Sequence, residues 1–522
     1  MNTLVDEGRL RSVNPATLEP VGAVPVTADV GPAVAKAAAA QESWGRTSFE
    51  QRRALLEGVA RVLVARMDEI AATVTAETGK PIVEAYTTEL MLAIEPLVWV
   101  GRNAERFLAP EPARYGVPYL VHKRARVVYE PLGVVGVIAP SNFPISIPVT
   151  QVATAVAAGN AVVLKPSELT PLSGDWVARV FAEAGAPEGL VGVVHGAGET
   201  GAALVEAAGV GKLVFTGTAA TGRKIAAAAA ELLRPVTLEL GGKDPMLVLR
   251  DADFERAVEG AAWGSFANCG QVCVGIERIY VARDLHARFV DALAERARGL
   301  KIGRGDDPET DVGPLITEQQ RADVEDLVAQ ALEQGAEAVA GARRPDVGLP
   351  GWFYEPTVLV GGDVGSRIER EEVFGPVVTV QPFDDEDEAV RLANGTSFGL
   401  GASIWSRDVG RARSLASRLH AGMVWTNDLG HSYGAGPAPW GGRKDSGSGR
   451  THSKHGLYDM THVKLVDTDR GRLRVPWWYP YGPRSLDGFK GVLELLHGDD
   501  KLRASWRHRR GLAYLAKRFL RG

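Results

Sequence analysis

Cysteine is scarce in this chain, and this scarcity restricts the thiol chemistry available. The 522 residues contain two cysteines, Cys269 and Cys273. So few cysteines exclude the disulfide framework of small secreted domains and fit a reducing compartment such as the cytoplasm. No second cysteine pair or histidine cluster lies near them to complete a set of metal ligands. We therefore expect a cytoplasmic protein without a metal ion.

A strong charge of one sign and long apolar runs are also missing. The 59 Lys and Arg residues nearly balance 64 Asp and Glu residues, for a net charge of -5. This balance implies no surface for polyanions, so nucleic acid is not an expected partner. No run of 18 or more apolar residues is present, and Met1–Glu7 lacks the basic and apolar regions of a secretory signal. The length alone predicts about three domains.

The middle of the chain alternates between strand and helix patterns. Apolar runs such as Val134–Ile138, Ala161–Leu164 and Lys212–Phe215 are separated by helical segments. Such alternation predicts right-handed crossovers and a mostly parallel sheet, with a nucleotide site at the carboxyl ends of its strands. After the cysteines, the strand pattern Glu277–Val281 and the helical pattern that follows it predict a second α/β lobe.

The region before this alternation is helical in pattern. Apolar residues at helical spacing predict one long helix from about residue 49 to residue 78. It would end at Gly79–Pro81, where glycine is a favoured C-cap and proline cannot continue a helix. A further helical stretch is predicted from about residue 82 to residue 107.

Two short segments carry residues that are typical of covalent catalysis. Phe266–Cys273 places Cys273 directly after a Gly-Gln-Val sequence, and a cysteine nucleophile needs a lowered pKa or a nearby base. Glu239 lies between two leucines in a strand-like segment, where apolar neighbours raise the pKa of a carboxyl toward the range of a general base. Taken singly, the cysteine fits an inert buried thiol, half of a disulfide or part of a metal site, and the glutamate fits a helix cap or an ion pair.

Together the two segments resemble the aldehyde dehydrogenase superfamily. In that superfamily the active-site thiol lies in Phe-x-Asn-x-Gly-Gln-x-Cys and the base in Leu-Glu-Leu-Gly-Gly-Lys, and this chain matches both at every defined position. The resemblance covers about residues 10–466 and implies an α/β fold with two Rossmann-like lobes and a small β extension for oligomerisation. The implied domains are an NAD-binding domain (1–112 and 133–241), a catalytic domain (242–450), oligomerisation strands (113–132 and 451–466) and an additional C-terminal tail (467–522).

The resemblance also implies a dinucleotide site. The turn Thr216–Gly222 lacks Gly-x-Gly-x-x-Gly and instead has the form that aldehyde dehydrogenases use in its place. Lys165 resembles the lysine that bonds the adenosine ribose, and Glu168 resembles the carboxylate that accepts from its 2′-hydroxyl. Because a carboxylate there repels a 2′-phosphate, NAD is favoured and NADP is the alternative. Without the resemblance, Lys165 and Glu168 fit a pair of residues in a solvated loop. The expected cofactor-binding residues are Lys165, Ser167, Glu168, Gly217, Thr218, Gly222, Leu240, Glu372 and Phe374.

The implied reaction is the NAD-dependent oxidation of an aldehyde to a carboxylate. The Cys273 thiolate would attack the carbonyl, and the amide of Asn142 and the backbone N–H of Cys273 would hold the oxyanion. A thioester would remain after hydride transfer, and Glu239 would activate the water that hydrolyses it. An acylating enzyme that uses CoA in place of water is the nearest alternative, and a non-catalytic scaffold is another. The retained base argues against the first, and the intact thiol, base and amide argue against the second.

The substrate is left open by the sequence. The family usually has tryptophan before the asparagine of Pro-x-Asn-Phe-Pro, whereas this chain has Ser141. The candidates for specificity are Arg278, His431 and Tyr433. An arginine that reaches the pocket would indicate a semialdehyde carboxylate, and apolar walls would indicate medium-chain or aromatic aldehydes.

The tail from residue 467 to residue 522 extends beyond the usual end of the family. It holds 13 Lys and Arg residues against 6 Asp and Glu residues. Val475–Pro483 is aromatic and rich in proline and is predicted to be extended, followed by two amphipathic helices at about 486–497 and 502–520, with Leu512, Leu515 and Phe519 on one face. We expect an arm that packs on a neighbouring subunit of a homodimer or homotetramer. The alternative is a basic helix on an anionic membrane, with lipid-derived aldehydes as substrates.

Overall fold

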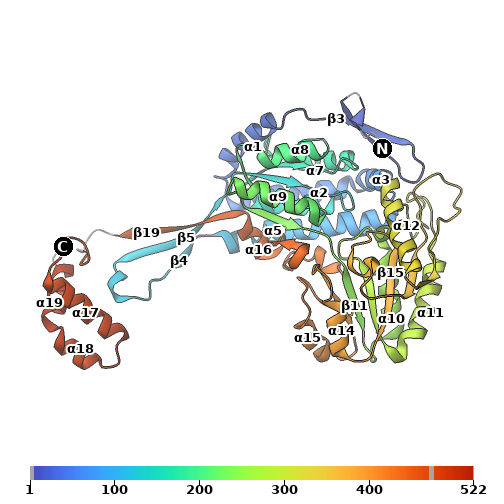
Figure 1. Cartoon of the computed structure of the whole chain (residues 1–522). Helices are drawn as coiled ribbons and strands as arrows, with labels where there is room; N and C mark the ends of the chain where they lie inside the picture. The colour runs from blue at the N-terminus through green and yellow to red at the C-terminus, as the bar shows by residue number, and fades with distance from the viewer. Residues whose placement is uncertain (1–4, 7, 470–474, 521–522) are drawn as a thin grey trace. The chain divides into compact units, whose positions relative to one another are not determined.

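The computed structural model describes residues 5–6, 8–469 and 475–520, which form two compact units. The larger unit extends to Leu108 and continues from Glu130 to His462, and the smaller unit combines Ala109–Tyr129 with the chain from Val463 onward (Figure 1). Residues 470–474 and 521–522 of the predicted tail lie outside the described residues, as do residues 1–4 and residue 7.

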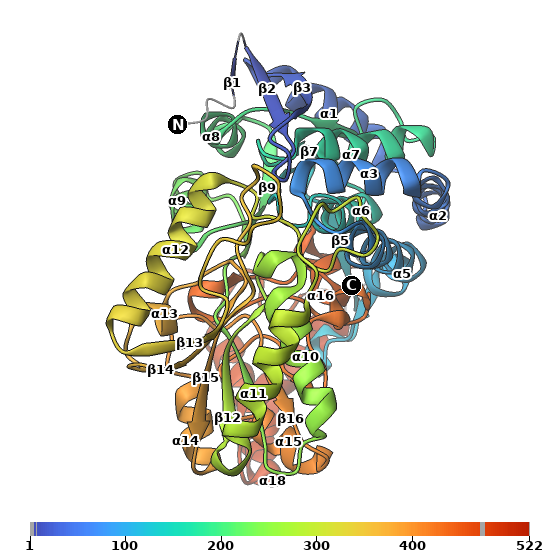
Figure 2. The ribbon, with the colours of Figure 1, turned by 90° about the vertical axis from the view of Figure 1, so that its right-hand side faces the viewer.

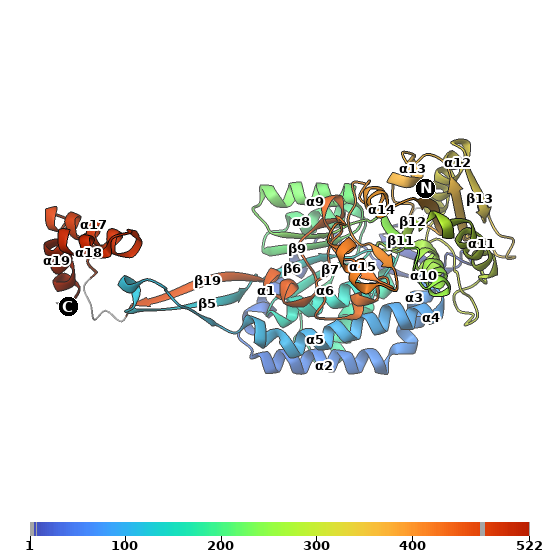
Figure 3. The same cartoon turned by 90° about the horizontal axis from the view of Figure 1, so that it is seen from below.

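The first sheet of the larger unit has six strands in the order β18-β10-β9-β6-β7-β8, parallel except for β18 at one edge. Its central strands are buried at every position because helices cover both faces. Figure 3 shows α8 and α9 on one side of the sheet and α2 and α5 on the other. The strands are β6 (Val134–Ile138), β7 (Ala161–Lys165), β8 (Val191–Val193), β9 (Val210–Thr216), β10 (Val236–Glu239) and β18 (Gly447–Ser448).

The helices of this lobe come mostly from the first half of the chain. They are α1 (Gly31–Trp44), α2 (Phe49–Ala65), α3 (Met67–Thr78), α4 (Ile82–Glu84), the π-helical turn η1 (Ala85–Leu90), α5 (Met91–Leu108), α6 (Ser146–Ala157), α7 (Pro171–Glu183), α8 (Gly198–Glu206) and α9 (Ala219–Glu231). The prediction of a single helix over 49–78 is wrong, because the chain leaves helical geometry at Arg66, with φ -110° and ψ 12°. The Arg66 guanidinium donates to Glu69 and Glu183, which fixes this break.

The strand order of the first sheet reverses at β6. β6 lies between β7 and β9, so the chain leaves β6 toward one side and returns through β9 on the other. Loops that diverge from neighbouring parallel strands leave an opening between them, the usual place of a ligand in such sheets. The loop after β6 carries Asn142, and the loop after β9 carries Gly217 and Thr218.

The second sheet has seven strands in the order β13-β14-β15-β12-β11-β16-β17, parallel except for β13. Helices α10 (Phe254–Phe266) and α11 (Arg283–Gly299) lie along one face (Figure 2) and enclose a core with Phe289 and Leu293. The predicted fold class, an α/β protein with two Rossmann-like lobes, is therefore confirmed. The remaining elements of this lobe are β11 (Asp244–Val248), β12 (Ile276–Ala282), α12 (Glu318–Glu333), β13 (Ala336–Ala340), β14 (Thr357–Gly361), α13 (Arg367–Arg370), β15 (Val377–Phe383), α14 (Glu386–Ala393), β16 (Ser403–Trp405), α15 (Val409–Ala416) and β17 (Trp425–Thr426).

Two small sheets complete the strand inventory of the described residues. The N-terminal antiparallel sheet contains β1 (Val5–Asp6), β2 (Arg9–Val13) and β3 (Pro20–Pro25). After α16 (Ser453–Asp459), the chain enters β19 (Thr461–Asp469), which pairs with β5 (Lys123–Pro131) in the order β19-β5-β4, where β4 is Glu111–Ala113.

The tail forms three helices, so the prediction of two is wrong. They are α17 (Pro483–His497), α18 (Lys501–Arg507) and α19 (Arg509–Leu520). The predicted second helix is interrupted at His508, whose Nδ1 lies 2.7 Å from an Asp487 carboxylate oxygen. The other Asp487 oxygen accepts from Gly511 N–H, so one carboxylate on α17 fixes the junction of the next two helices. The segment before α17 contains turns instead of being extended.

Candidate active site

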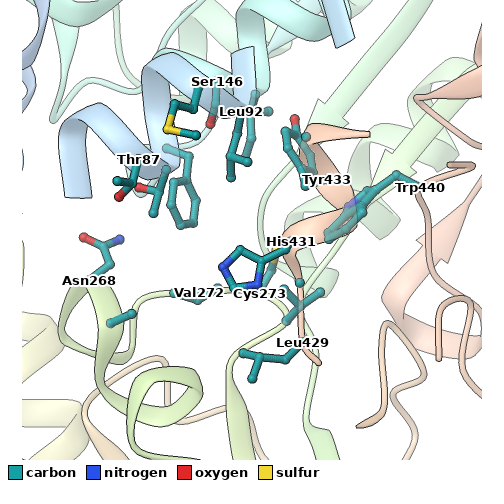
Figure 4. Close-up of a pocket in the computed structure, with 18 of the residues that line it drawn as sticks. Thr87, Leu92, Ser146, Asn268, Val272, Cys273, Leu429, His431, Tyr433 and Trp440 are labelled. Atoms are coloured by element: carbon teal, nitrogen blue, oxygen red, sulfur yellow. The ribbon is translucent and has the colours of Figure 1, made fainter. Parts of the chain in front are cut away.

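The larger unit contains a cavity of about 910 Å³ that Cys273 and Glu239 both line. In Figure 4 the side chains of Thr87, Leu92, Tyr433 and Trp440 surround the same space as Cys273. The walls are mainly apolar and aromatic. Their large apolar residues are Val83, Met91, Leu92, Ile94, Phe143, Ile147, Leu240, Trp263, Val272, Val274, Leu400, Leu429, Tyr433 and Trp440.

Glu239 is the last residue of β10 and is 5% exposed. Neither oxygen of its carboxyl has a hydrogen-bond partner among the described residues. Burial raises the pKa of this carboxyl well above its usual range, and the charge of Arg450 opposes the shift in part. A carboxyl with a raised pKa that faces a cavity has the basicity and the free lone pairs that a general base requires.

The loop that carries Cys273 is tightly bent. Asn268, Cys269 and Gly270 follow one another in the left-handed region, with φ of 49°, 55° and 71°. For the two that are not glycine, this conformation costs on the order of 1–3 kcal/mol each. The Gln271 side chain stabilises the bend, since its amide donates to the Asn268 carbonyl (2.9 Å) and accepts from Ile316 N–H (3.0 Å). Both thiols are free, and Cys273 lines the cavity whereas Cys269 does not.

The electrostatic surroundings of Cys273 favour the thiol over the thiolate. Burial raises the pKa of the thiol, and the nearby carboxylates of Glu372, Asp244 and Glu239 raise it further. Because the thiolate is the reactive form, attack requires a positive charge nearby or a group that takes the proton.

Gly241 and Gly242 allow the segment after β10 to approach the Cys273 loop and the segment that carries Glu372. A Cβ atom on Gly242 would lie 2.2 Å from the Cys273 carbonyl oxygen, and one on Gly241 would lie 2.1 Å from Oε2 of Glu372. Glycine is therefore needed at both positions for the backbone after Glu239 to approach Cys273 and Glu372. The Gly242 N–H donates to Glu372 Oε1 (3.1 Å), and burial raises the pKa of Glu372 to about 8.

Asn142 lies next to the Cys273 loop but does not line the cavity. Its side-chain amide donates to the Gln271 carbonyl at 3.0 Å. An amide nitrogen carries two N–H groups, so one remains to donate to a further acceptor. The backbone carbonyl of Asn142 accepts from Lys80 Nζ (2.9 Å) and from the Asn268 side chain (3.2 Å).

A buried ion pair that no sequence pattern predicts stabilises the loop between β6 and α6, which carries Asn142. Lys80 and Glu89 are fully buried, and their charged atoms are 2.7 Å apart. The second Glu89 oxygen accepts from the N–H groups of Ile145 and Ser146, which begin α6 and have no partner within the helix. From the sequence, Lys80 is interpreted only as part of a helix end, because the residues around it give no sign of a distant carboxylate.

We expect Lys80→Met to destabilise the protein by about 3–5 kcal/mol, because it leaves the Glu89 charge buried without its partner. The urea midpoint at fixed protein concentration measures this loss, and Lys80→Met with Glu89→Gln should recover part of it. The matched control is Lys36→Met, which breaks an exposed pair with Glu188 and should cost less than about 1 kcal/mol. Equal costs for the two single variants would contradict this interpretation.

The predicted cofactor residues lie at carboxyl ends of the first sheet or beside the Cys273 loop. Lys165 ends β7 and forms an ion pair with Glu168 at 3.1 Å, and Ser167 lies between them in sequence. Thr218 caps α9 through its hydroxyl. A Cβ on Gly222 would lie 2.6 Å from Leu240, so the first turn of α9 packs closely against that residue.

This arrangement fits a dinucleotide. The first turn of α9 would offer backbone N–H groups to a pyrophosphate, whereas the Gly217 N–H already donates to the Glu239 carbonyl at 3.0 Å. The pair Lys165 and Glu168 would offer a donor and an acceptor to ribose hydroxyls. Phe374 has a φ of 50°, and its N–H donates to Glu277 at 3.0 Å, which holds the Glu372–Phe374 segment beside the Cys273 loop.

Two of the three specificity candidates line the cavity, and the third does not. His431 and Tyr433 line the cavity, where His431 stacks on Trp263 with ring centroids 4.9 Å apart. Arg278 does not line it, because its guanidinium is buried and donates to the carbonyls of Lys243, Leu392 and Ala393. Of the three specificity candidates, Arg278 therefore does not reach the cavity, and it gives no indication of a semialdehyde substrate.

Comparison with known proteins decides the family. A family profile described as "Aldehyde dehydrogenase family" matches residues 4–466. The chain belongs to this family. The dehydrogenase is 38% identical over 460 residues to a 4,4'-diapolycopene aldehyde oxidase of Methylomonas sp, covering 88% of this chain and 85% of that one. It is 38% identical over 453 residues to a betaine aldehyde dehydrogenase of Bacillus subtilis, covering 85% of this chain and 90% of that one.

Solved structures agree with this assignment. An aldehyde dehydrogenase of Mycobacterium tuberculosis complexed with NAD+ shares 35% identity, with a TM-score of 0.84 over 88% of this chain and 95% of that one. The predicted family and the class of NAD(P)-dependent aldehyde dehydrogenase are confirmed. The family match ends at residue 466, where the predicted additional tail begins.

Proposed function

We propose that this aldehyde dehydrogenase oxidises an aldehyde to the carboxylate through a thioester on Cys273. The observation that carries the proposal is the shared cavity, which is lined both by the Cys273 thiol and by a buried carboxyl with no hydrogen-bond partner among the described residues. NAD, when bound, supplies the hydride acceptor and a positive charge that favours the thiolate. The residues proposed to hold it are those at the carboxyl ends of the first sheet, together with Leu240, Glu372 and Phe374.

Each protein group has one task in this reaction. After its proton has passed to solvent, the Cys273 sulfur forms a bond to the carbonyl carbon and the carbonyl π bond breaks. The resulting oxyanion accepts from the Cys273 N–H and the remaining N–H of Asn142. Loss of hydride from the carbon leaves a thioester. Glu239 then takes a proton from water as the water attacks, and the carbon–sulfur bond breaks to release the carboxylate and the thiol. The buried base supports water as the acceptor and argues against CoA.

Apolar aldehydes fit the cavity best. Among the described residues that line it, none is lysine or arginine, which argues against a semialdehyde carboxylate. Of its three carboxyls, Glu84 accepts from Asn268 N–H and Glu95 is exposed. The third, Glu239, is assigned to the activation of water, so no further buried carboxyl remains for a cationic substrate. The aromatic and aliphatic walls favour medium-chain or aromatic aldehydes.

NAD is proposed as the preferred cofactor, and a homo-oligomer as the assembly. The Glu168 carboxylate beside Lys165 favours a 2′-hydroxyl and repels a 2′-phosphate. β19 is an edge strand with Val463, Leu465 and Val466 exposed, a surface that pairing with a second copy would cover. In this assignment the segments 113–132 and 451–466 join subunits. The NAD-binding domain consists of residues 1–112 and 133–241. The catalytic domain, residues 242–450, carries the thiol.

A substrate panel tests the proposal. We expect kcat/KM for hexanal or benzaldehyde to exceed that for succinic semialdehyde and for betaine aldehyde by about tenfold or more, because a charged group would lose its hydration without gaining a partner. NADH formation by the purified full chain measures this, and the assay is repeated with NADP. A preference for either charged aldehyde would contradict the substrate assignment, and equal rates with NADP would contradict the role of Glu168.

A further inference from the structure

We propose that the C-terminal helices α17 to α19 bind an anionic membrane surface. No helix in the described part of the chain meets the length and apolarity needed to cross a bilayer. The inference therefore concerns a surface contact, in which apolar side chains enter the interface and cations meet lipid phosphates.

The helical tail buries the apolar face that the sequence predicted for docking. A Cβ on Gly488 would lie 2.7 Å from Leu515, and one on Gly491 would lie 2.9 Å from Leu512, so α19 packs closely on α17. Phe519 lies edge-on to His122, with ring centroids 5.3 Å apart. This face is used within the smaller unit.

Other apolar side chains of the tail are exposed on its surface. Leu486 and Leu493 lie seven residues apart on one face of α17, and Leu502 and Trp506 lie four apart on one face of α18. Leu502 is 86% exposed and Trp506 is 72% exposed. The segment before α17 adds the exposed aromatic residues Trp478, Tyr479 and Tyr481. Tryptophan and tyrosine are the residues that membrane interfaces favour.

Positive charge accompanies these residues. Residues 475–520 contain nine Lys and Arg residues against four Asp and Glu residues, in a chain whose overall charge is negative. Two of the acids, Asp487 and Glu494, are engaged by His508, and Asp500 caps α18. Seven exposed cations form no ion pair with another described residue: Arg484, Lys490, Lys501, Arg503, Arg509, Arg510 and Lys517.

The alternation of cations with apolar residues favours a membrane over a second copy of the chain. Lys490 shares the face of Leu486 and Leu493, and Lys501 and Arg503 flank Leu502. A protein interface that buried these leucines would also desolvate the cations, which is costly unless a carboxylate meets each one. At a membrane the same cations extend to the phosphates while their stems and the neighbouring rings enter the interface.

Surface binding would place the enzyme where apolar aldehydes accumulate. This benefit rests on the proposed function, whereas the binding itself does not. A sedimentation assay needs no catalysis, so the failure of one proposal is distinguishable from the failure of the other.

The test is co-sedimentation of the full chain with vesicles of phosphatidylcholine, alone or mixed with phosphatidylglycerol. We expect binding to the anionic vesicles to be at least about tenfold stronger and to fall severalfold when salt rises from about 0.1 M to about 0.5 M. Leu502→Ser with Trp506→Ser should weaken binding by about tenfold or more. The matched control, Val64→Ser with Leu233→Ser, changes exposed apolar residues of the larger unit and should bind like the unmodified chain.

Three outcomes would overturn the proposal. The first is equal binding to both kinds of vesicle, or to neither. The second is binding that salt does not reduce. This measurement uses the unmodified chain, so it does not depend on whether a variant folds. The third is a smaller oligomer for the double tail variant in sedimentation velocity without lipid, which would show instead that the tail is an arm on a neighbouring subunit.

Discussion

Cys273→Ala is expected to abolish aldehyde oxidation, with a loss of kcat on the order of 10⁴-fold or more. Without the sulfur no thiohemiacetal forms, and hydride loss from the hydrated or free aldehyde has no covalent route. NADH formation at saturating hexanal and NAD measures the loss. The Cys273 side chain is half-buried on a loop end, so its truncation should leave the fold and NAD binding intact.

Cys269→Ala is the matched control, because it removes the same atom from the same bent loop. Its thiol is buried away from the cavity, so we expect kcat to fall by less than about threefold and the main effect to be a small loss of stability. Residual oxidation in Cys273→Ala above about 1% of the unmodified rate, or parallel losses in the two variants, would remove Cys273 from the role of nucleophile.

The residues proposed to carry the chemistry could be predicted because their local sequence is restrictive. Glu239 between two leucines at the end of a strand predicts burial, and the structure buries it with a raised pKa. The glycines at 241 and 242 are required by the close approach of Cys273 and Glu372. Each of these features depends on a few neighbouring residues, and such patterns are visible in a sequence.

Contacts between distant segments could not be predicted in the same way. Arg278 lies on β12, and its side chain could enter a cavity or donate to backbone carbonyls. Which of the two occurs depends on how α14 and the segment after β10 pack against that strand. Lys80 pairs with Glu89 across a π-helical turn that apolar spacing does not reveal. The tail was correctly predicted as helical, but its break at His508 depends on a carboxylate of another helix.

Glu84 provides a demanding control for the proposed base. It also lines the cavity, and burial raises its pKa to about 7, so by pKa alone it would qualify as a general base. However, its Oε2 accepts from Asn268 N–H at 2.9 Å and supports the bend before Cys273. Glu84→Gln should therefore weaken acylation and turnover together, without separating the first hydride transfer from the later steps.

Glu239→Gln should separate those steps. We expect a burst of NADH close to one per active site, followed by a steady state about 10²–10⁴-fold slower than that of the unmodified enzyme, because glutamine cannot take the proton of the attacking water. Stopped-flow absorbance measures both phases. The unmodified enzyme should lose steady-state rate as pH falls through the pKa of Glu239, since only the carboxylate is a base, and burial places this loss above the usual carboxyl range. The variant should lack that pH dependence. Turnover at the unmodified rate, or a burst followed by slow turnover in Glu84→Gln instead, would move the role of base away from Glu239.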